Sequence, residues 1–513
     1  MKRIKSFSAI AVIITMLLSN VVFASPAKKI YSDDIELVMV ADGKIALFDG
    51  ADTVLDKTPY FADDILMIPA EYVLESYGYT VSKSDTGLKA EGESEIELSI
   101  ASNLIKINGE EKTLKKETVK NGSEIFCSED ILEILGCKVR ITKSGILAVS
   151  KSGNFTDFDE NIFLHLQGVY VATDGKYGAA GTPAAPVDGL EAAKKIAVRY
   201  MKEYGASYPV HIFVKGGTYR FKSGVSFDET EFTLNTYKGL SIENFDESMP
   251  EFTGSVLLDQ EKFTPVTDAV TLARVHKNAR GKVASLDLRE MGIKKLENQP
   301  NLFYYIYLND IEQTNARWPN EGEATIFSVP QQNSFTFSET DPTRWTDAKN
   351  AYVFGHFSSA GWEWHQGIIT SVNAATKTIN IKGAANDVLK TTAAGTGWYA
   401  ANLLEELDMP GEWYVDTDNL KLYYYPPYRL KDQKLEMTAY LGTLLTFNNS
   451  KNLTVKGINF SKCGRAIEFT GNSINGVTIT KCEFSHGQVS RFVAFPNGDV
   501  VYNVQITENK VYN

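Results

Sequence analysis

Three segments near the end of the chain repeat one pattern: LTVKGINF from Leu453, VTITKCEF from Val477 and VQITENKV from Val504. The copies start 24 and 27 residues apart, about the length of one coil of a parallel β-solenoid and too long for a hairpin repeat. Within each copy, apolar residues alternate with polar ones, as in a strand with one buried face. The pattern predicts that the chain winds in coils, with equivalent positions stacked one above the next.

A second strand is expected between the copies. Arg465–Phe469 and Arg491–Phe495 are 26 residues apart, which predicts a second stacked face in the same register. A solenoid coil cannot bury its apolar side alone and needs neighbours and a cap at each end. The last coil stops at Asn513 in mid-pattern, without a polar capping turn. We therefore expect the sequence to be truncated at the C-terminus relative to a longer chain.

The first 24 residues have the features of a secretory signal peptide. Lys2, Arg3 and Lys5 precede an apolar run over Ala9–Leu18, and Ala24 closes a small-residue cleavage site. A membrane anchor needs about 18 uninterrupted apolar residues, and this run is shorter. No later segment is apolar enough to span a bilayer. The sequence predicts a secreted or cell-surface protein, cleaved near Ala24, with no transmembrane segment in the mature chain.

Charge and composition narrow the classes of partner. The net charge of −12 argues against a nucleic-acid partner, because phosphate binding needs clustered basic residues. The four cysteines have no metal-ligand spacing, so we expect no metal site and no cofactor. Whether Cys127 and Cys137 form a disulfide is left open. Aromatic residues make up 11% of the chain, with 25 tyrosines, which suits a sugar-binding surface.

Residues 30–152 contain a duplication. The segment Ile68–Tyr79 returns 58 residues later as Phe126–Cys137, and each copy combines a helical period, a closing glycine and a β-rich run. The arrangement resembles the copper amine oxidase-like N-terminal domain of exported bacterial proteins. That resemblance implies a stalk or attachment module, for example to a cell wall. It does not imply amine oxidation, which needs three histidine ligands, because residues 30–152 contain no histidine.

The second part of the chain opens with a strand, a helix and a strand. Val169–Ala172 is followed by a helical stripe that starts at Leu190 and is expected to cover the open end of the solenoid. Val210–Val214 then leads into a tight corner at Gly216–Tyr219. This order resembles the opening of right-handed parallel β-helix enzymes that act on polysaccharides. From about 286 to 428 the coil period disappears, which indicates a β-rich insertion.

Two segments inside the insertion carry a more specific resemblance. Ala316–Asn320 (ARWPN) and Leu404–Asp416 (LEELDMPGEWYVD) are similar to segments of β-helix glycoside hydrolases of the xylosidase, xylanase and α-fucosidase type. With the coils, the resemblance covers 162–513. It implies hydrolysis of a polysaccharide or oligosaccharide. The chain is thus expected to be mainly β: a right-handed parallel β-helix with a β-rich insertion, preceded by a small duplicated α+β domain.

Glycoside hydrolysis needs two carboxyl groups across the scissile bond, about 5 Å apart in retaining enzymes. Adjacent coils lie about 4.8 Å apart, so two outward acids one coil apart would suit. The outward acids are Glu468, Glu483, Asp499 and Glu508. We take Asp499, in a loop, and Glu468, on a strand, as candidate catalytic residues. The alternative for each is a solvated surface residue, and the resemblance implies that the true pair lies beyond Asn513.

Candidate substrate-binding residues lie in the insertion. A short segment contains Trp362, Trp364 and His365, with an acid between the two tryptophans. If the segment is a strand, both indoles share one face. The C–H face of a sugar stacks on indole, so the segment is a candidate substrate wall. The alternative is aromatic packing inside the insertion.

Arg465 and Arg491, one coil apart, would present two cations to a uronate. The alternative is pairing with nearby acids such as Glu468. Three hypotheses follow: an exported glycoside hydrolase, a non-catalytic polysaccharide-binding surface protein, and a polysaccharide lyase acting on uronates.

Overall fold

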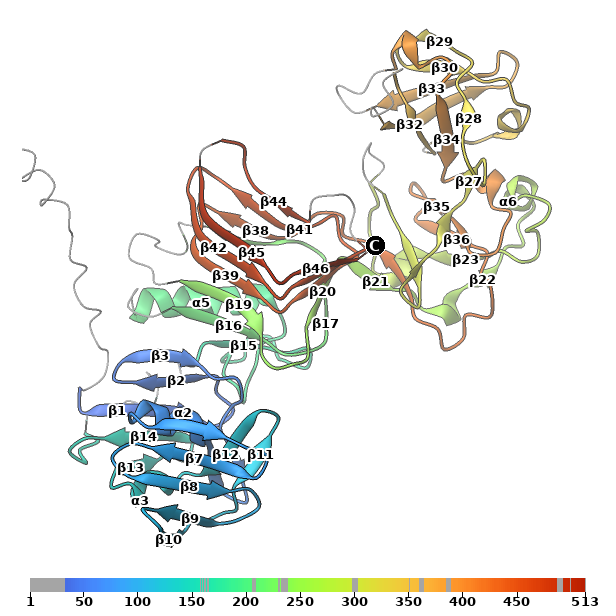
Figure 1. Cartoon of the computed structure of the whole chain (residues 1–513). Coiled ribbons are helices and arrows are strands. Elements are labelled where there is room, and N and C mark those ends of the chain that lie inside the picture. Colours follow the sequence, from blue (N-terminus) through green and yellow to red (C-terminus); the bar gives the residue numbers. More distant parts are fainter. Residues whose placement is uncertain are drawn as a thin grey trace, which may run out of the picture.

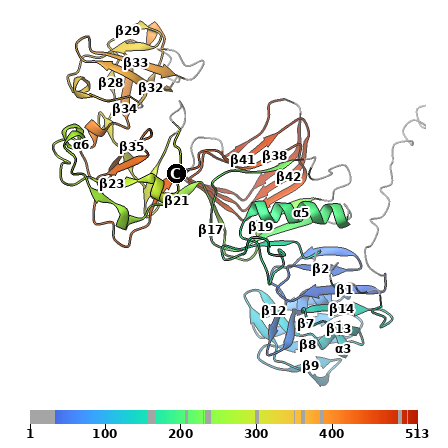
Figure 2. The same cartoon turned by 180° about the vertical axis from the view of Figure 1, so that it is seen from behind.

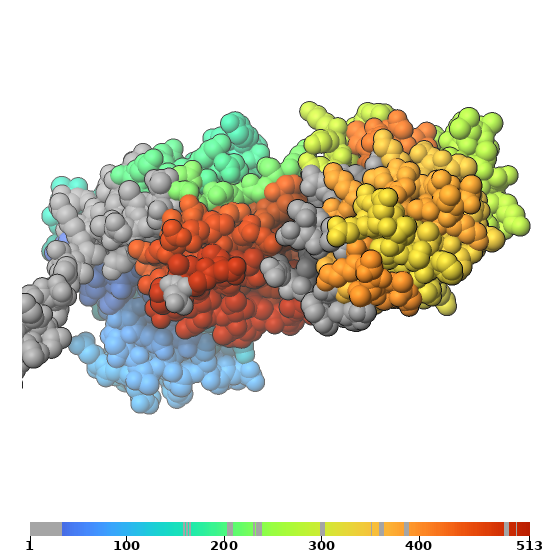
Figure 3. All heavy atoms as spheres, turned by 90° about the horizontal axis from the view of Figure 1, so that it is seen from above, coloured from blue at the N-terminus to red at the C-terminus, as the bar shows by residue number. Residues whose placement is uncertain are grey.

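The computed structural model describes residues 33–512, apart from 157, 159, 161–162, 164–165, 205–208, 229–230, 232–238, 298–302, 350, 359–363, 384–388, 487–491 and 499. Figure 1 shows three parts: an N-terminal domain, a middle part of parallel strands, and a large insertion on its other side. The space-filling view confirms that the N-terminal domain and the insertion lie on different sides of the parallel strands (Figure 3).

The N-terminal domain consists of antiparallel sheets around one core. Each copy of the duplication forms a strand, a short helix and a strand, and the helices α2 (Ala70–Ser76) and α3 (Ile131–Ile134) are followed by Gly78 and Gly136. Both glycines have positive φ, 84° and 88°, a conformation that ends helices and favours glycine. The sheets run β13(Lys138–Ile141)-β14(Ile146–Ser150)-β1(Ile35–Val40)-β2(Ile45–Phe48)-β3(Ala51–Val54), β10(Glu110–Thr113)-β9(Leu104–Ile107)-β8(Glu95–Ser99)-β7(Gly87–Glu91)-β6(Thr80–Lys83) and β11(Val119–Asn121)-β12(Glu124–Ser128)-β5(Ile65–Pro69)-β4(Tyr60–Ala62).

The middle part, called here the parallel-stranded part, has three parallel sheets within the described residues. The chain visits them in turn, so that each round adds one strand to each sheet. The sheets are β15(Val169–Val171)-β16(Val210–Val214)-β19(Leu240–Asn244)-β39(Lys451–Lys456)-β42(Ile474–Thr480)-β45(Val501–Thr507), β17(Thr218–Arg220)-β20(Glu251–Thr253)-β40(Asn459–Ser461)-β43(Glu483–Ser485)-β46(Lys510–Tyr512) and β18(Val225–Asp228)-β38(Thr443–Asn448)-β41(Arg465–Thr470)-β44(Val493–Ala494).

The register of these sheets follows the sequence repeat. Leu453 pairs with Val477, and Val477 pairs with Val504, all in parallel. Phenylalanines stack in the core in the same way: the ring centroids of Phe460 and Phe484 are 5.4 Å apart, and the ring planes are nearly parallel. Identical apolar positions of successive rounds therefore bury one another, which is the physical basis of the repeat.

The helix α5 (Leu190–Tyr204) packs on the first rounds. Its stripe of Ala193, Ala197 and Met201 belongs to the core cluster of the parallel-stranded part. Figure 2 shows the helix running alongside β19, on the side nearer the N-terminal domain. Within the described residues, no helix combines the length and apolar character needed to cross a membrane.

The insertion leaves the rounds after β20 and returns at β38. Its strands, most of which pair antiparallel, extend from β21 (Ser255–Leu257) to β37 (Leu435–Thr438), beyond the predicted 286–428 at both ends. The strands at the two ends of the insertion are two to four residues long, which is too short for an alternation of apolar and polar residues to be recognised in the sequence. The sheets are β21(Ser255–Leu257)-β37(Leu435–Thr438)-β24(Ile306–Leu308)-β25(Ile311–Glu312), then β22(Thr264–Pro265)-β23(Ala284–Asp287)-β36(Lys421–Tyr424)-β35(Glu412–Asp416)-β26(Thr314–Asn315), then β27(Arg317–Trp318)-β34(Gly397–Ala401)-β31(Tyr352–His356)-β32(Trp364–Asn373)-β33(Thr378–Gly383)-β30(Ser334–Thr336)-β29(Ser328–Gln331), with β28(Ala324–Thr325) beside β34.

A buried ion network holds the insertion against the parallel-stranded part. Glu436 on β37 is fully buried and contacts three cations: Arg220 at 2.8 Å, Lys462 at 2.8 Å and Lys434 at 3.1 Å. Buried Lys462, which follows β40, also contacts Asp310 of the insertion at 2.5 Å. The carboxylate of Glu436 thus joins elements more than 200 residues apart in sequence.

The N-terminal domain packs directly on the first strands of the parallel-stranded part. A shared apolar cluster includes Val38 and Leu47 from one side and Tyr170 and Phe213 from the other. The Tyr170 hydroxyl accepts a hydrogen bond from the backbone N–H of Lys44 at 2.9 Å. Such a covered apolar contact fixes the domain in place.

A histidine lies in this contact between the two parts. Buried His211 on β16 stands between Asp52 of the N-terminal domain, with Nε2–Oδ2 at 3.7 Å, and Glu243 on β19, with Nδ1–Oε1 at 3.3 Å. Burial alone would lower the pKa of His211, but hydrogen bonds and charges from the two carboxylates outweigh it and raise the pKa above 6.5. Lys44 and Lys456 also interact with the carboxylate of Glu243.

We expect this histidine to make stability depend on pH. Because the folded pKa of His211 is raised, its contribution is complete below the unfolded value of about 6.5 and is lost as pH rises through the folded value. The free energy of unfolding of wild type should fall relative to that of His211→Gln as the pH rises above about 6.5. Calorimetric scans of both proteins measure this difference. A constant difference over that range would contradict the role of His211.

Candidate functional site

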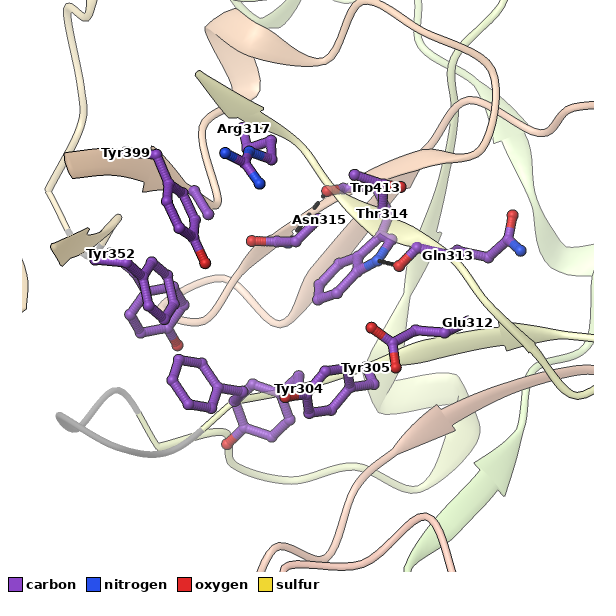
Figure 4. Close-up of a pocket in the computed structure, with 13 residues that line it drawn as sticks. Tyr304, Tyr305, Glu312, Gln313, Thr314, Asn315, Arg317, Tyr352, Tyr399 and Trp413 are labelled. Atoms are coloured by element: carbon purple, nitrogen blue, oxygen red, sulfur yellow. Dashed lines mark hydrogen bonds between the residues drawn. The ribbon is translucent and has the colours of Figure 1, made fainter. Parts of the chain in front are cut away.

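A cavity of about 350 Å³ opens where the sheets of the insertion meet. Its walls come from residues 303–305 just before β24, from β25 to β27, from β31 and β34, and from β35 (Figure 4). Both segments that resemble glycoside hydrolases contribute to it, ARWPN through Arg317 and LEELDMPGEWYVD through Trp413. The lining residues are Phe303, Tyr304, Tyr305, Glu312, Gln313, Thr314, Asn315, Arg317, Tyr352, Phe354, Tyr399, Ala401 and Trp413.

Stacked rings form one wall of the cavity. Phe303 stacks on Phe354 at 5.1 Å between centroids, and Phe354 stacks on Tyr399 at 4.7 Å. The guanidinium of Arg317 also lies over the Tyr399 ring, 3.9 Å from the ring centroid. The four side chains form a column in which each member holds its neighbour, so the wall is preorganised.

Arg317 is fixed in its plane as well. Its Nε donates to the carbonyl oxygen of Pro319 at 2.9 Å, and its Nη2 donates to that of Gly322 at 2.8 Å. Trp413 is anchored in the same manner, since its Nε1 donates to the carbonyl oxygen of Gln313 at 3.0 Å. These bonds set the side chains before any ligand arrives.

Several polar groups of the cavity have hydrogen-bonding capacity to spare. The Tyr352 side chain is 4% exposed, yet its hydroxyl has no partner within the described part of the chain. Asn315 uses its Nδ2 to donate to the carbonyl oxygen of Trp413 at 3.2 Å, while its Oδ1 points into the cavity (Figure 4). The Tyr399 hydroxyl points the same way. Buried polar groups are almost always paired, so the unpaired Tyr352 hydroxyl indicates a polar ligand, and the Asn315 and Tyr399 oxygens lie where they can bind it.

Glu312 provides a carboxyl group on the side of the cavity opposite Arg317 (Figure 4). Water reaches its side chain, but the surrounding walls desolvate the carboxylate and raise the pKa of Glu312 above its usual range. No described residue forms an ion pair with it. Burial likewise raises the pKa of Tyr305 to about 12, so this hydroxyl stays protonated.

The lining of the cavity combines one carboxyl group with an aromatic wall. Hydrolysis needs two carboxyl groups facing one bond, and Glu312 is the one acid among the described residues that line the cavity. Within the described residues there is also no cluster of three or more metal-binding side chains. Aromatic walls with a few polar groups are the usual composition of a small-ligand site.

Acids of the LEELDMPGEWYVD segment are committed to structure. Burial raises the pKa of both Glu406 and Glu412 to about 7. Glu412 accepts hydrogen bonds from two successive backbone N–H groups at 2.8 Å, and Glu406 accepts from Trp345 Nε1 at 2.5 Å. They hold the turn that presents Trp413 to the cavity.

The predicted aromatic wall lies beside the cavity. Trp364 is 40% exposed, and its ring centroid is 5.9 Å from that of Tyr399, so it extends the aromatic surface outside the lining. His365, the next residue of β32, instead packs near Phe357 at 5.6 Å. Trp362 lies outside the described residues.

The candidates on the parallel-stranded part are separate from the cavity. Glu468 forms an ion pair with Arg465 and accepts a hydrogen bond from Thr443 Oγ1 at 3.1 Å. The surface pairing considered above as the alternative for Arg465 is thus present. Asp499 and Arg491 lie outside the described residues, and the catalytic role of Glu468 and Asp499 stays a prediction.

The sequence interpretation did not single out Glu312, Asn315, Tyr352 or Tyr399. Their strands are far apart in the chain, and no spacing connects them. The available signal in the sequence was the pair of segments that resemble glycoside hydrolases, because each contributes one residue to the cavity, Arg317 or Trp413.

The parts described so far define a chain with an N-terminal α+β domain, a parallel-stranded β part and an antiparallel insertion. Residues 47–146 match the family model described as the copper amine oxidase N-terminal domain, which confirms the predicted resemblance of this domain. The search of curated proteins gave no match.

Three solved structures are similar at low identity. One titled "Glycoside hydrolase" has a TM-score of 0.47 and 16% identity, covering 62% of this chain and 67% of the other. "The complex structure of XylC with xylose" has a TM-score of 0.27 and 10% identity, with coverages of 67% and 63%. The Gp54 tailspike of Acinetobacter baumannii bacteriophage AP22, in complex with capsular saccharide, has a TM-score of 0.15 and 12% identity, with coverages of 58% and 41%. At these scores the similarities carry no argument about activity.

Proposed function

We propose that this chain is a carbohydrate-active protein that binds a glycan in the cavity of its insertion. The observation that carries the proposal is the combination of an aromatic wall with polar groups that face the cavity: the Tyr352 hydroxyl, which has no partner within the described residues, and Asn315 Oδ1. A sugar offers both an apolar C–H face and many hydroxyl groups, and so complements such a wall.

The sequence resemblance extends the proposal to the whole chain. In this account the three parallel sheets are the faces of a right-handed parallel β-helix, and the protein is exported and hydrolyses polysaccharide or oligosaccharide. The cavity then serves as a binding site that holds the glycan near the parallel-stranded part. Non-catalytic binding of a cell-surface or plant polysaccharide is the second candidate, favoured by the single carboxyl group in the cavity.

Tyr399→Ala should weaken glycan binding at least about tenfold, or ~1.4 kcal/mol. The substitution removes the hydroxyl that points into the cavity and the surface on which Arg317 rests. Isothermal titration with xylo-oligosaccharides, fucosylated oligosaccharides and pectic oligosaccharides measures the effect.

Tyr177→Ala is the matched control, because this tyrosine is 86% exposed and far from the insertion in sequence. It should bind as wild type does. Binding by Tyr399→Ala with unchanged affinity, or no binding of any of these glycans to wild type, would remove the proposal.

A further inference from the structure

Within the described residues, the one cation that lines the cavity, Arg317, has no acidic partner. Two of the three guanidinium nitrogens of Arg317 donate to backbone carbonyl groups, which are neutral. The third, Nη1, makes no hydrogen bond to any described residue, and no described carboxylate forms an ion pair with the side chain. In a chain with 64 acidic residues, an arginine left unpaired in a cavity indicates a ligand with negative charge.

The charges of the cavity are also separated. Arg317 and Tyr399 lie at one end and Glu312 at the other (Figure 4). A ligand that spans the cavity would place one group against the guanidinium and another against the carboxyl group. Among the described residues that line the cavity, Arg317 is the one cation.

We infer that the bound glycan is acidic, an oligosaccharide with a uronic acid whose carboxylate pairs with Arg317. The planar fork of arginine matches a carboxylate. Hydroxyl groups of the same sugar fit the Tyr352 hydroxyl and Asn315 Oδ1. The inference rests on the proposed function and adds the chemical class of the ligand.

A carboxylate fits this site better than a phosphate. A phosphate monoester carries a charge of about −1.5 to −2 at neutral pH, and one arginine would leave part of it uncompensated. Glu312 would add to the repulsion. Because burial raises the pKa of Glu312, this carboxyl group takes up a proton more easily when an anion binds. Protonation then reduces the repulsion between Glu312 and the ligand.

A charge-matched pair of ligands tests the inference. Oligogalacturonate and a glucuronic-acid-bearing xylo-oligosaccharide are titrated into the protein beside their methyl esters, which keep the shape and lose the charge. We expect at least one acid to bind about tenfold or more tighter than its ester. Arg317→Gln should remove that preference, whereas Arg317→Lys, which keeps the charge and loses the fork, should retain part of it.

The outcomes separate the two proposals. Equal binding of acid and ester, or tighter binding of neutral xylo-oligosaccharide than of both acids, would overturn the acidic ligand and leave glycan binding intact. Tighter binding of a sulfated or phosphorylated oligosaccharide than of both acids would also overturn it. Failure of every glycan to bind removes the proposed function itself. An unchanged tryptophan fluorescence spectrum shows that each Arg317 variant is folded, since all six tryptophans lie between residues 318 and 413.

Discussion

Replacing Glu436 with glutamine is expected to destabilise the insertion by about 3–5 kcal/mol, the usual cost of removing one partner from a buried ion network. The change keeps the shape of the side chain but leaves Arg220, Lys434 and Lys462 around a neutral group. Urea unfolding followed by tryptophan fluorescence measures the effect, because every tryptophan of the chain lies in the insertion.

The same network should respond to acid. Burial by itself would raise the pKa of Glu436, but Lys462, Arg220 and Lys434 outweigh it and lower the pKa below the usual 4.5. The contribution of Glu436 is therefore present above about pH 4.5 and is lost as pH falls through the lowered value. The free energies of unfolding of wild type and of Glu436→Gln should therefore approach each other as the pH falls through that range.

Glu290→Gln is the matched control for this prediction. Glu290 is 53% exposed and lies 3.5 Å from Lys262, so its replacement should cost no more than about 1 kcal/mol. If Glu436→Gln costs as little as Glu290→Gln, the network does not hold the insertion in place.

Phe460→Ala is expected to destabilise the parallel-stranded part by about 3–5 kcal/mol through loss of buried area and a residual cavity. Phe460 is fully buried, with Phe252 at 5.7 Å on one side and Phe484 at 5.4 Å on the other. The loss should therefore be transmitted to the rounds on both sides. Urea unfolding followed by far-ultraviolet circular dichroism measures it.

Phe61→Ala serves as the control, since Phe61 is 46% exposed. Its effect should be within about 1 kcal/mol. A loss at Phe460 of similar size would mean that the stacked positions do not share one core, contrary to the register of the strands.

The parallel rounds were predictable because their periodicity has a direct physical cause. Leu453, Val477 and Val504 bury one another, so they must be of similar character and evenly spaced. The helix at Leu190 was predictable for a related reason, since one apolar stripe faces the core. Both signals are local in sequence or repeat at a fixed distance.

The limits of the insertion and its cavity follow no such rule. Glu312, Tyr352 and Tyr399 come from three strands of two sheets, β25, β31 and β34, which come together only in the folded chain, and each strand is too short to show a period. Trp364 was singled out for its ring, yet it lies at the side of the site rather than within it. The cysteines left open by the sequence, Cys127 and Cys137, are free thiols.

A crystal structure of the protein with a bound oligosaccharide tests the central claim most directly. The account predicts sugar density inside the cavity, in contact with Arg317 and within hydrogen-bonding distance of Tyr352 and Asn315. Density on another surface, with the cavity empty at a ligand concentration that saturates binding in solution, would contradict it.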